Sequence, residues 1–273
     1  MKDKYSAVWV SHSSISDYLR CPRAYFLRNM YRDPKTNHKI SIIEPPLALG
    51  QAVHGAIEQI SVLPVEKRFS VPLVERFEEV WKTVSGQKGG FKEKEQEEQY
   101  RKRALSMIRR ISKHPGPLVR KAVKIRQDLP YFWLAEEENI ILCGKVDWLE
   151  YDDLTDGVNI VDFKTGKFDE DPESLQLPIY YLLATHTQTK KVTGISYWYL
   201  DRDDNPTVMT LPVEEEAHKR ILDVAKKIVL ARKLGHFVCR EGGCRMCRPY
   251  EMVLAGKATY IGLNDFGQDL YVY

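Results

Sequence analysis

The chain has 273 residues, of which 43% are hydrophobic and 29% are charged, and its formal net charge is +3. This composition is typical of a soluble globular protein with one large or two modest domains, and it does not point to a strongly charged partner. No apolar run reaches the ~20 residues that a membrane span requires, and Met1–Val10 lacks a signal-peptide core, so we expect a cytosolic protein with no membrane partner.

The first part of the chain, residues 1–118, is predicted to be mainly helical. Apolar residues recur at helical spacing in four segments, residues 11–32, 47–62, 73–84 and 93–114. The first of these helices is interrupted at Cys21, because the following proline disfavours helix at the preceding residue. The second carries Gly50, His54 and Glu58 at steps of four residues, so these three side chains share one face.

The middle part, residues 119–235, is predicted to combine strands with two helices. The expected strands are Val119–Lys124, Tyr131–Glu136, Asn139–Tyr151 and Val158–Thr165, followed by a hairpin of Gly194–Asp201 and Thr207–Val213. The expected helices are Leu175–Thr187 and Glu214–Lys233, the second with acidic residues at its start and basic residues at its end, as the helix dipole favours. The sequence therefore predicts an α/β (α+β) fold.

Charged residues interrupt two of the predicted apolar strands. Side chains alternate along a strand, so Asp162 and Lys164 share a face, while Val161 and Phe163 point into a core. A hairpin partner can bring Asp147 to the same edge. Two carboxylates and an ammonium in an apolar setting are costly unless they are paired or bind a metal. The pattern predicts a Mg²⁺ or Mn²⁺ site with a lysine beside it.

Five cysteines and two basic segments complete the pattern. Cys239, Cys244 and Cys247 form a compact trio, whereas Cys21 and Cys143 are distant in sequence. An odd number in a reducing compartment favours thiols or metal ligands over a disulfide framework. The basic segments, residues 92–124 and 226–248, either face an anionic polymer or are the solvated faces of amphipathic helices.

An ordered set of motifs resembles a known group of enzymes. The motifs are Gly50 with His54 and Glu58, Gly144–Lys145–Val146–Asp147, Asp162–Phe163–Lys164–Thr165–Gly166, and Gln176–Leu177–Pro178–Ile179–Tyr180. Together they resemble the PD-(D/E)xK nuclease superfamily and, within it, the RecB-type exonuclease group, which includes CRISPR-adaptation nucleases and AddB-type helicase-nucleases. The resemblance implies a restriction-endonuclease-like core, with a central mixed sheet flanked by helices. A helical N-terminal portion (1–118), the sheet core (119–235) and a cysteine-rich segment (236–273) would form one domain over 1–273.

The resemblance also implies roles for the residues. His54, Asp147, Asp162 and the backbone carbonyl of Phe163 would hold Mg²⁺ or Mn²⁺, and Lys164 would orient the attacking water or neutralise the charge that develops on the phosphate. Gln176 and Tyr180, one helical turn apart, would position Lys164 and the nucleic-acid backbone. Taken singly, His54 also suits a core histidine, and Gln176 with Tyr180 an ordinary buried polar pair.

For the cysteines, the resemblance implies a [4Fe–4S] cluster on Cys21, Cys239, Cys244 and Cys247. The spacing departs from the usual pattern, in which a third cysteine follows the Cys-x₂-Cys pair, because here Cys239 lies upstream of it. Structural Zn²⁺ is the alternative, since four thiolates also satisfy a tetrahedral zinc ion. Cys143 is expected to be a buried residue of a strand.

Two functions are compatible with this pattern. The first is a metal-dependent DNA nuclease, an exonuclease on single strands or DNA ends, acting in DNA repair or CRISPR adaptation. The second is a non-catalytic DNA-binding subunit of a helicase-nuclease or CRISPR-adaptation complex. The chain has no GxxxxGK[ST] phosphate loop, so any helicase motor would be a separate partner chain.

Overall fold

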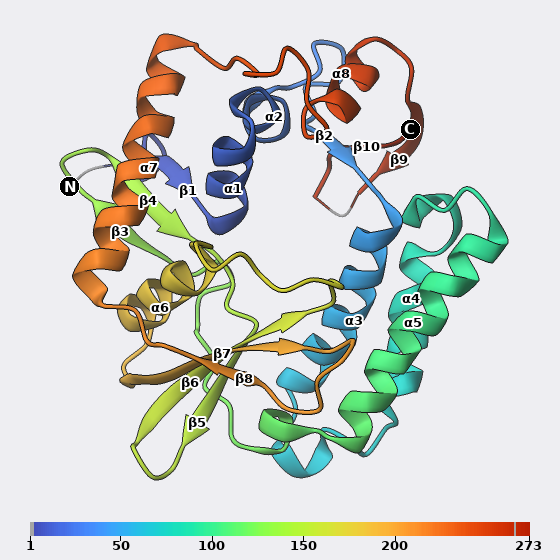
Figure 1. The fold of residues 1–273 in the computed structure, drawn as a ribbon, viewed down its shortest axis with the longest axis vertical. Coiled ribbons are helices and arrows are strands. Elements are labelled where there is room, and N and C mark those ends of the chain that lie inside the picture. The colour runs from blue at the N-terminus through green and yellow to red at the C-terminus, as the bar shows by residue number, and fades with distance from the viewer. Residues whose placement is uncertain (1–2, 265) are drawn as a thin grey trace. The chain divides into compact units, whose positions relative to one another are not determined.

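The computed structural model in Figure 1 describes residues 3–264 and 266–273. The chain forms two compact units. The central unit comprises Pro45–Phe132 and Leu142–His218, and the terminal unit comprises Met1–Glu44, Trp133–Ile141 and Lys219–Tyr273. The fold is mixed α/β, as predicted, and is consistent with a restriction-endonuclease-like core. The single domain over residues 1–273, with parts ending at 118 and 235, stays a prediction.

A four-stranded mixed sheet forms the framework of the central unit. Its strands, in spatial order, are β5 (Trp148–Asp152), β6 (Gly157–Lys164), β7 (Val192–Tyr199) and β8 (Thr207–Met209). β6 pairs with β5 in antiparallel register and with β7 in parallel register, while β7 and β8 form the predicted hairpin. β6 is thus an inner strand, bonded along both edges.

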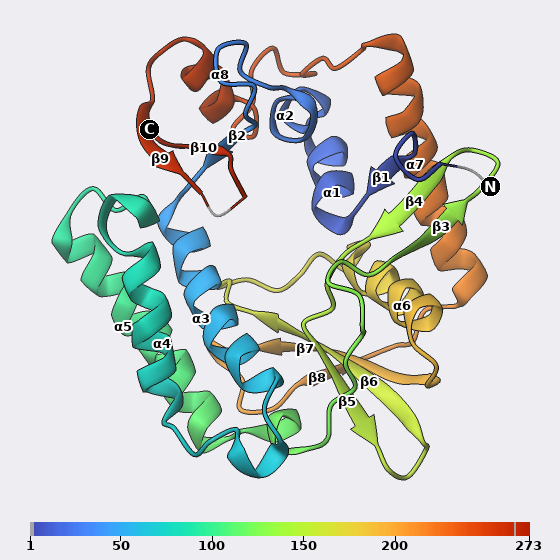
Figure 2. The same ribbon diagram turned by 180° about the vertical axis from the view of Figure 1, so that it is seen from behind.

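Three helices cover one face of this sheet. They are α3 (Pro45–Ser61), α4 (Leu73–Val84) and α5 (Lys94–Lys113), which lie side by side in Figures 1 and 2. Phe77 and Ile108, both fully buried, belong to the same apolar cluster as Val161, Phe163 and Trp198 of the sheet. The predicted inward orientation of Val161 and Phe163 is therefore confirmed.

Helix α6 (Gln176–Thr187) packs against β6 and β7. Its first turn reaches the side chains of Asp162 and Lys164, which alternate with the buried Val161 and Phe163 along β6. The predicted helix start is confirmed within one residue. Ser174 takes part in it, since its hydroxyl accepts a hydrogen bond from the Gln176 amide at 3.3 Å.

Two of the predicted strands are wrong in detail. The segment Asn139–Tyr151 is not one strand but two, β4 (Ile140–Cys143) and β5, because β4 pairs with β1 (Val8–Val10) and β3 (Tyr131–Ala135) whereas β5 pairs with β6, and residues 144–147 between them belong to no strand. Residues 119–124 form no strand in the described structure, apart from a single bridge between Ala122 and Glu150. The Leu118 and Arg120 carbonyls instead accept hydrogen bonds from the buried guanidinium of Arg68.

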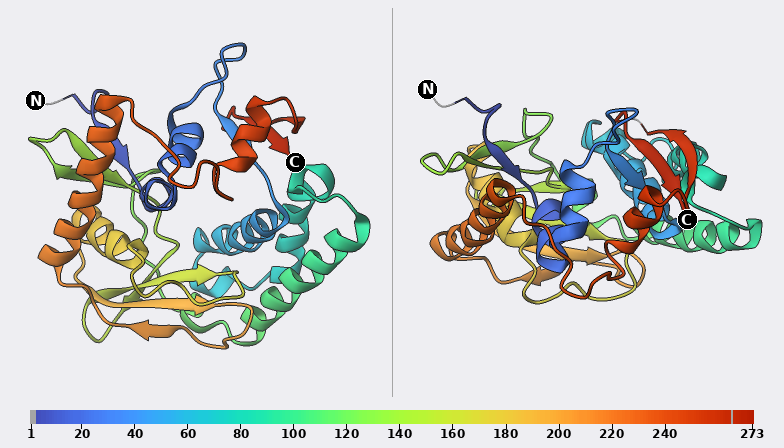
Figure 3. Two further views of the ribbon diagram at one scale, coloured as in Figure 1. Left: turned by 45° about the horizontal axis from the view of Figure 1, so that its top comes forward. Right: turned by 90° about the horizontal axis from the view of Figure 1, so that it is seen from above.

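The terminal unit contains the predicted N-terminal helical segment, most of the predicted helix Glu214–Lys233 and the predicted strand at residues 131–136, together with short elements that the sequence pattern did not reveal. The helices are α1 (His12–Arg20), α2 (Pro22–Tyr25), α8 (Arg248–Leu254) and most of α7 (Glu214–Leu234). The strands β1 (Val8–Val10), β4 and β3 (Tyr131–Ala135) form one sheet, and β2 (Ile40–Ile42), β10 (Asp269–Val272) and β9 (Thr259–Leu263) form another. Figure 3 shows α8 beside the second sheet.

The break in the first helix is confirmed at Cys21, which caps the start of α2 and has extended backbone angles. A π-helical turn, Phe26–Met30, continues this segment. None of the helices in the described part of the chain combines the length and the apolar character that a transmembrane span requires.

Candidate active site and cysteine site

The first half of the candidate active site lies between α3 and the start of β5. Asp147 immediately precedes β5, and its Oδ2 accepts a hydrogen bond from the Phe163 amide at 3.0 Å. His54, in the middle of α3, places Nδ1 3.5 Å from the same carboxylate oxygen. The His54 ring is also hydrogen-bonded to the backbone of Phe163. The side chains of two predicted metal ligands, His54 and Asp147, therefore lie together beside the backbone of Phe163.

The second half of the site lies at the end of β6, beneath the first turn of α6. Gln176 Nε2 donates to Asp162 Oδ1 at 2.9 Å and lies 3.3 Å from the Tyr180 hydroxyl, while Gln176 Oε1 accepts from the Lys164 ammonium. Lys164 Nζ also lies 3.0 Å from Asp162 Oδ2 and 2.9 Å from Glu170 Oε2. The structure thus brings four of the five predicted catalytic residues into one network, while Asp147 is hydrogen-bonded to the Phe163 amide in the first half of the site.

Burial makes the two aspartates costly to ionise. Desolvation raises the pKa of Asp147, against the opposing effect of the Phe163 amide, and raises the pKa of Asp162, with a further rise from the neighbouring Asp147 charge. Desolvation also lowers the pKa of His54, which favours the neutral imidazole that a metal requires. The metal-free site is therefore short of positive charge.

Lys164 is held in its charged form. Burial alone lowers the pKa of this ammonium, but the carboxylates of Asp162 and Glu170 outweigh that effect and raise it overall. The Tyr197 ring adds a cation–π contact, with Nζ 4.9 Å from the ring centroid. The phenol pKa of Tyr180 is raised, chiefly by burial, so its hydroxyl remains protonated and can donate a hydrogen bond.

The donor set fits a hard divalent cation. Asp162 is 1% exposed, and its Oδ2 receives no hydrogen bond with proper geometry from any described residue, although the Lys164 ammonium lies 3.0 Å away. An ion pair without an aligned donor leaves that oxygen with lone pairs to offer. Together with the Asp147 carboxylate, the neutral His54 imidazole and the Phe163 backbone, it provides the oxygen and nitrogen ligands that suit Mg²⁺ or Mn²⁺.

A cleft of about 380 Å³ opens onto this site within the central unit. Its lining includes His54, Asp147 and Phe163, and also the side chains of Lys124 and Lys145. Lys145 is two-thirds exposed and only weakly paired with Glu58, at 3.5 Å. The cleft therefore combines the candidate metal ligands with two accessible cations.

Two contacts of this site were not predicted. Glu170 lies in the polar loop after β6, where it is one of three consecutive acidic residues, and only the folded loop turns it towards Lys164. Arg103 of α5 donates to the Thr165 carbonyl at 2.7 Å and pairs with Asp201 at 3.0 Å. Part of the basic charge of α5 is thus used inside the protein, which favours the amphipathic-helix interpretation for this arginine.

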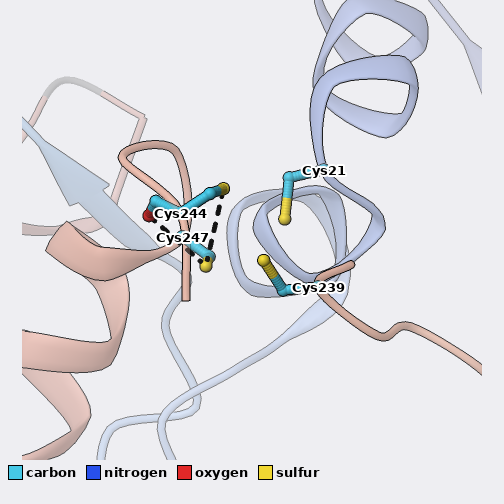
Figure 4. Close-up of side chains that lie close together, drawn as sticks. All are labelled: Cys21, Cys239, Cys244 and Cys247. Carbon is cyan, nitrogen blue, oxygen red and sulfur yellow. Dashed lines mark hydrogen bonds between the residues drawn. The ribbon is translucent and has the colours of Figure 1, made fainter. Parts of the chain in front are cut away.

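The four predicted cluster cysteines meet in the terminal unit. Their sulfur atoms all lie within 4.8 Å of one another, and Figure 4 shows Cys21 and Cys239 turned towards each other beside the Cys244–Cys247 pair. No two of the described cysteines form a disulfide. The fifth, Cys143, is buried at the end of β4, as predicted, and burial raises its thiol pKa to about 11.

The environment of the sulfur atoms suits bound thiolates. The Ala24 amide donates to Cys21 Sγ at 3.4 Å, and hydrogen bonds from the backbone, chiefly at Glu241, lower the pKa of Cys239 to about 7. Burial has the opposite effect on Cys247, whose pKa rises to about 12. Buried thiolates without a cation are unfavourable, so the four cysteines together form a site that could hold a metal.

Comparison with known proteins agrees with this geometry. A family model described as the PD-(D/E)XK nuclease superfamily matches residues 9–252, which include every candidate residue of both sites. No curated protein matches the chain. The matched segment covers most of the sequence, and the chain belongs to the PD-(D/E)XK nuclease superfamily.

Proposed function

We propose that this protein is a Mg²⁺- or Mn²⁺-dependent deoxyribonuclease that hydrolyses phosphodiester bonds at the end of β6. The observation that carries the proposal is the Lys164 ammonium, fixed between Asp162, Glu170 and Gln176, with the Asp162 carboxylate 1% exposed. An ordinary core would not keep so many charges together, because each buried charge is costly to desolvate.

Each residue of the candidate site has its own role in the proposed hydrolysis. Asp147, Asp162, His54 and the Phe163 carbonyl hold the divalent ion, which would polarise the scissile phosphate and acidify a bound water. Lys164 orients that water or neutralises the developing phosphate charge. Gln176 is hydrogen-bonded to both Asp162 and Lys164, and so fixes the separation between the metal ligand and the ammonium.

We further propose exonuclease action on single-stranded DNA or DNA ends. The support is the cleft beside the candidate metal ligands, whose volume of about 380 Å³ suits one or a few nucleotides better than a duplex. Lys124 and Lys145 line it and can contact backbone phosphates next to the cleaved one. A separate helicase or a CRISPR-adaptation protein is the proposed kind of partner, in a cytosolic setting of repair or adaptation.

The cysteine site has a structural part in this proposal. The resemblance to RecB-type nucleases implies a [4Fe–4S] cluster and leaves zinc as the alternative. In either case the group ties Cys21 to residues 239–247 within the terminal unit and takes no part in hydrolysis.

A nuclease assay on end-labelled linear and covalently closed circular single-stranded DNA, with Mn²⁺, tests the proposal. The wild-type protein should shorten the linear strand progressively from one end and leave the circle intact. Asp162→Asn should lower the rate by about 10²-fold or more, because it removes a charged metal ligand. Asp153→Asn is the matched control, since this exposed aspartate lies in the β5–β6 turn and pairs with Lys121.

Cleavage of the circular DNA would show that the protein acts as an endonuclease and not as an exonuclease. Equal rates for the wild-type protein and Asp162→Asn would refute the catalytic site. DNA binding without Mn²⁺-dependent cleavage would instead favour the non-catalytic subunit.

A further inference from the structure

The four cysteines of the terminal unit form a closed shell of sulfur around one small space. Cys21 starts α2, Cys239 follows α7 in sequence, and Cys244 and Cys247 lead into α8. Three of these side chains are buried, with Cys247 at 1% exposure. We infer that this shell binds a single tetrahedral Zn²⁺ ion rather than the [4Fe–4S] cluster that the family resemblance implies.

The separation of the sulfur atoms carries this inference. A zinc–sulfur bond of about 2.3 Å places neighbouring sulfurs of a tetrahedral site about 3.8 Å apart. The Cys244 and Cys247 sulfurs are 3.8 Å apart, and all four lie within 4.8 Å of one another. This is the size of a shell around one ion.

A four-iron cluster needs a larger shell. Each cysteine would bind a different iron atom, with four inorganic sulfides between the irons, so the cysteine sulfurs must stand well outside a cube of eight atoms. The side chains packed around the site, Ala24 and Met246, lie against the cysteines and leave them in mutual contact. The observed shell does not fit the cluster.

The backbone around the shell supports the short separation. Cys244 and Cys247 belong to one tight turn, in which the Arg248 amide donates to the Cys244 carbonyl at 3.0 Å. Gly242 and Gly243 have φ angles of 67° and 146°, which residues with a side chain rarely adopt, and they bring the chain back from Cys239 to Cys244. A salt bridge of 2.6 Å between Arg23 and Glu251 joins α2 to α8 beside the sulfurs.

The order of metal affinities, not the geometry, favours zinc over a single iron. Both ions accept four thiolates in a tetrahedron, but at a given site Zn²⁺ binds more tightly than Fe²⁺. Cysteine pairs separated by two residues, with two further thiolates, are typical ligands of structural zinc. In the usual cluster spacing the third cysteine lies downstream of the Cys-x₂-Cys pair, whereas here Cys239 lies upstream of it. This spacing is compatible with the ligand set of a single ion.

The test is the elemental content of the full-length protein, expressed with both metals in the medium and purified anaerobically. Zinc, iron and acid-labile sulfide are measured per chain, and no nuclease assay is involved. About one zinc with neither iron nor sulfide is expected. About four iron atoms with four sulfides, one iron without sulfide, or no bound metal would each overturn the inference.

Two variants test where the ion binds and whether a lower zinc content reflects a lost ligand or a misfolded protein. Cys239→Ser should lower the zinc content at least tenfold, whereas Cys143→Ala, at the cysteine of β4, should keep it unchanged. Replacing the ion of the wild-type protein by Co²⁺ should produce intense thiolate-to-cobalt absorption bands, and their absence would contradict a site of four sulfurs. Zinc content is independent of the proposed hydrolysis, so either claim can fail alone.

Discussion

The candidate active site and the cysteine site differ in how their buried ionisable groups are arranged. The network of the candidate active site combines carboxylates, an ammonium and an amide, so that opposite charges offset one another. The cysteine shell consists of one kind of atom, and its members lie within 4.8 Å of one another. If both sites bind metal as proposed, the first should exchange its ion readily and the second should retain it.

Loss of a cysteine ligand should have the largest effect. We expect Cys247→Ser to destabilise the terminal unit by about 4 kcal/mol or more, because metal binding and folding are coupled. Hydrogen exchange read by mass spectrometry measures this in each segment. Protection should fall in residues 3–44 and 219–273 more than in the central unit, and an even loss over both units would contradict the assignment.

Glu170→Gln should slow cleavage without unfolding the protein. Its carboxylate lies 2.9 Å from Lys164 Nζ, so its loss frees the ammonium to move towards Asp162. We expect kcat to fall about 10- to 100-fold with little change in KM, because misplacement of a catalytic group affects the transition state more than binding.

Glu170→Asp should recover part of this rate. Asp169→Asn is the matched control, since this neighbouring acid pairs with Arg202 and lies outside the network. Equal losses in Glu170→Gln and Asp169→Asn would show that loop charge, not the contact with Lys164, matters.

The raised pKa of Asp162 in the metal-free candidate site should make the stability of the protein depend on pH. Because the pKa of Asp162 is raised on folding from an ordinary value of 3.8, the folded state binds more protons, and the stability contributed by this group falls as the pH rises above that value. Because asparagine does not ionise, Asp162→Asn removes this loss of stability at higher pH. Measured in chelator, the Tm of the variant relative to the wild-type protein should rise between about pH 4 and about pH 7, the interval between the ordinary and the raised pKa, by ~2–4 °C per kcal/mol.

A difference in Tm that stays constant or falls with pH would contradict the raised pKa. Addition of Mn²⁺ at the higher pH should reverse the order, since only the wild-type protein has both carboxylates to bind it.

Cys143→Ala should have the smallest effect. This residue lies in the buried strand β4, and no described cysteine forms a disulfide. We expect a loss of about 1 kcal/mol in urea unfolding, from a small cavity, with unchanged zinc content and unchanged nuclease rate. A loss of metal on this substitution would mean that the shell is not formed by the other four cysteines.

Local sequence patterns predicted much of the candidate active site. Asp162 and Lys164 share a strand face, and Gln176 and Tyr180 share a helix face, so alternation and helical spacing predict each pair. Glu170 was missed because its contact with Lys164 depends on the path of an irregular loop. The break between Cys143 and Trp148 was missed because the sequence pattern does not reveal where the chain leaves one sheet for another.

The terminal unit was less predictable for a related reason. Its strands β1, β2, β9 and β10 have three to five residues each, too few for a clear alternation. β2 and β10 pair in parallel although they stand at opposite ends of the chain, which only the fold can bring about. The cysteines were found by their chemistry, and the distance between their sulfurs required the structure.

The central claim is that Asp162 binds the metal while Lys164 acts on the phosphate. The most direct measurement combines calorimetric titration of Mn²⁺ with single-turnover cleavage of end-labelled single-stranded DNA by Lys164→Ala and Asp162→Asn. We predict that Lys164→Ala still binds Mn²⁺ but cleaves about 10²-fold or more slowly, while Asp162→Asn loses both properties. The proposed roles would be contradicted if Lys164→Ala cleaved DNA at the wild-type rate, or if Asp162→Asn bound Mn²⁺ with wild-type affinity.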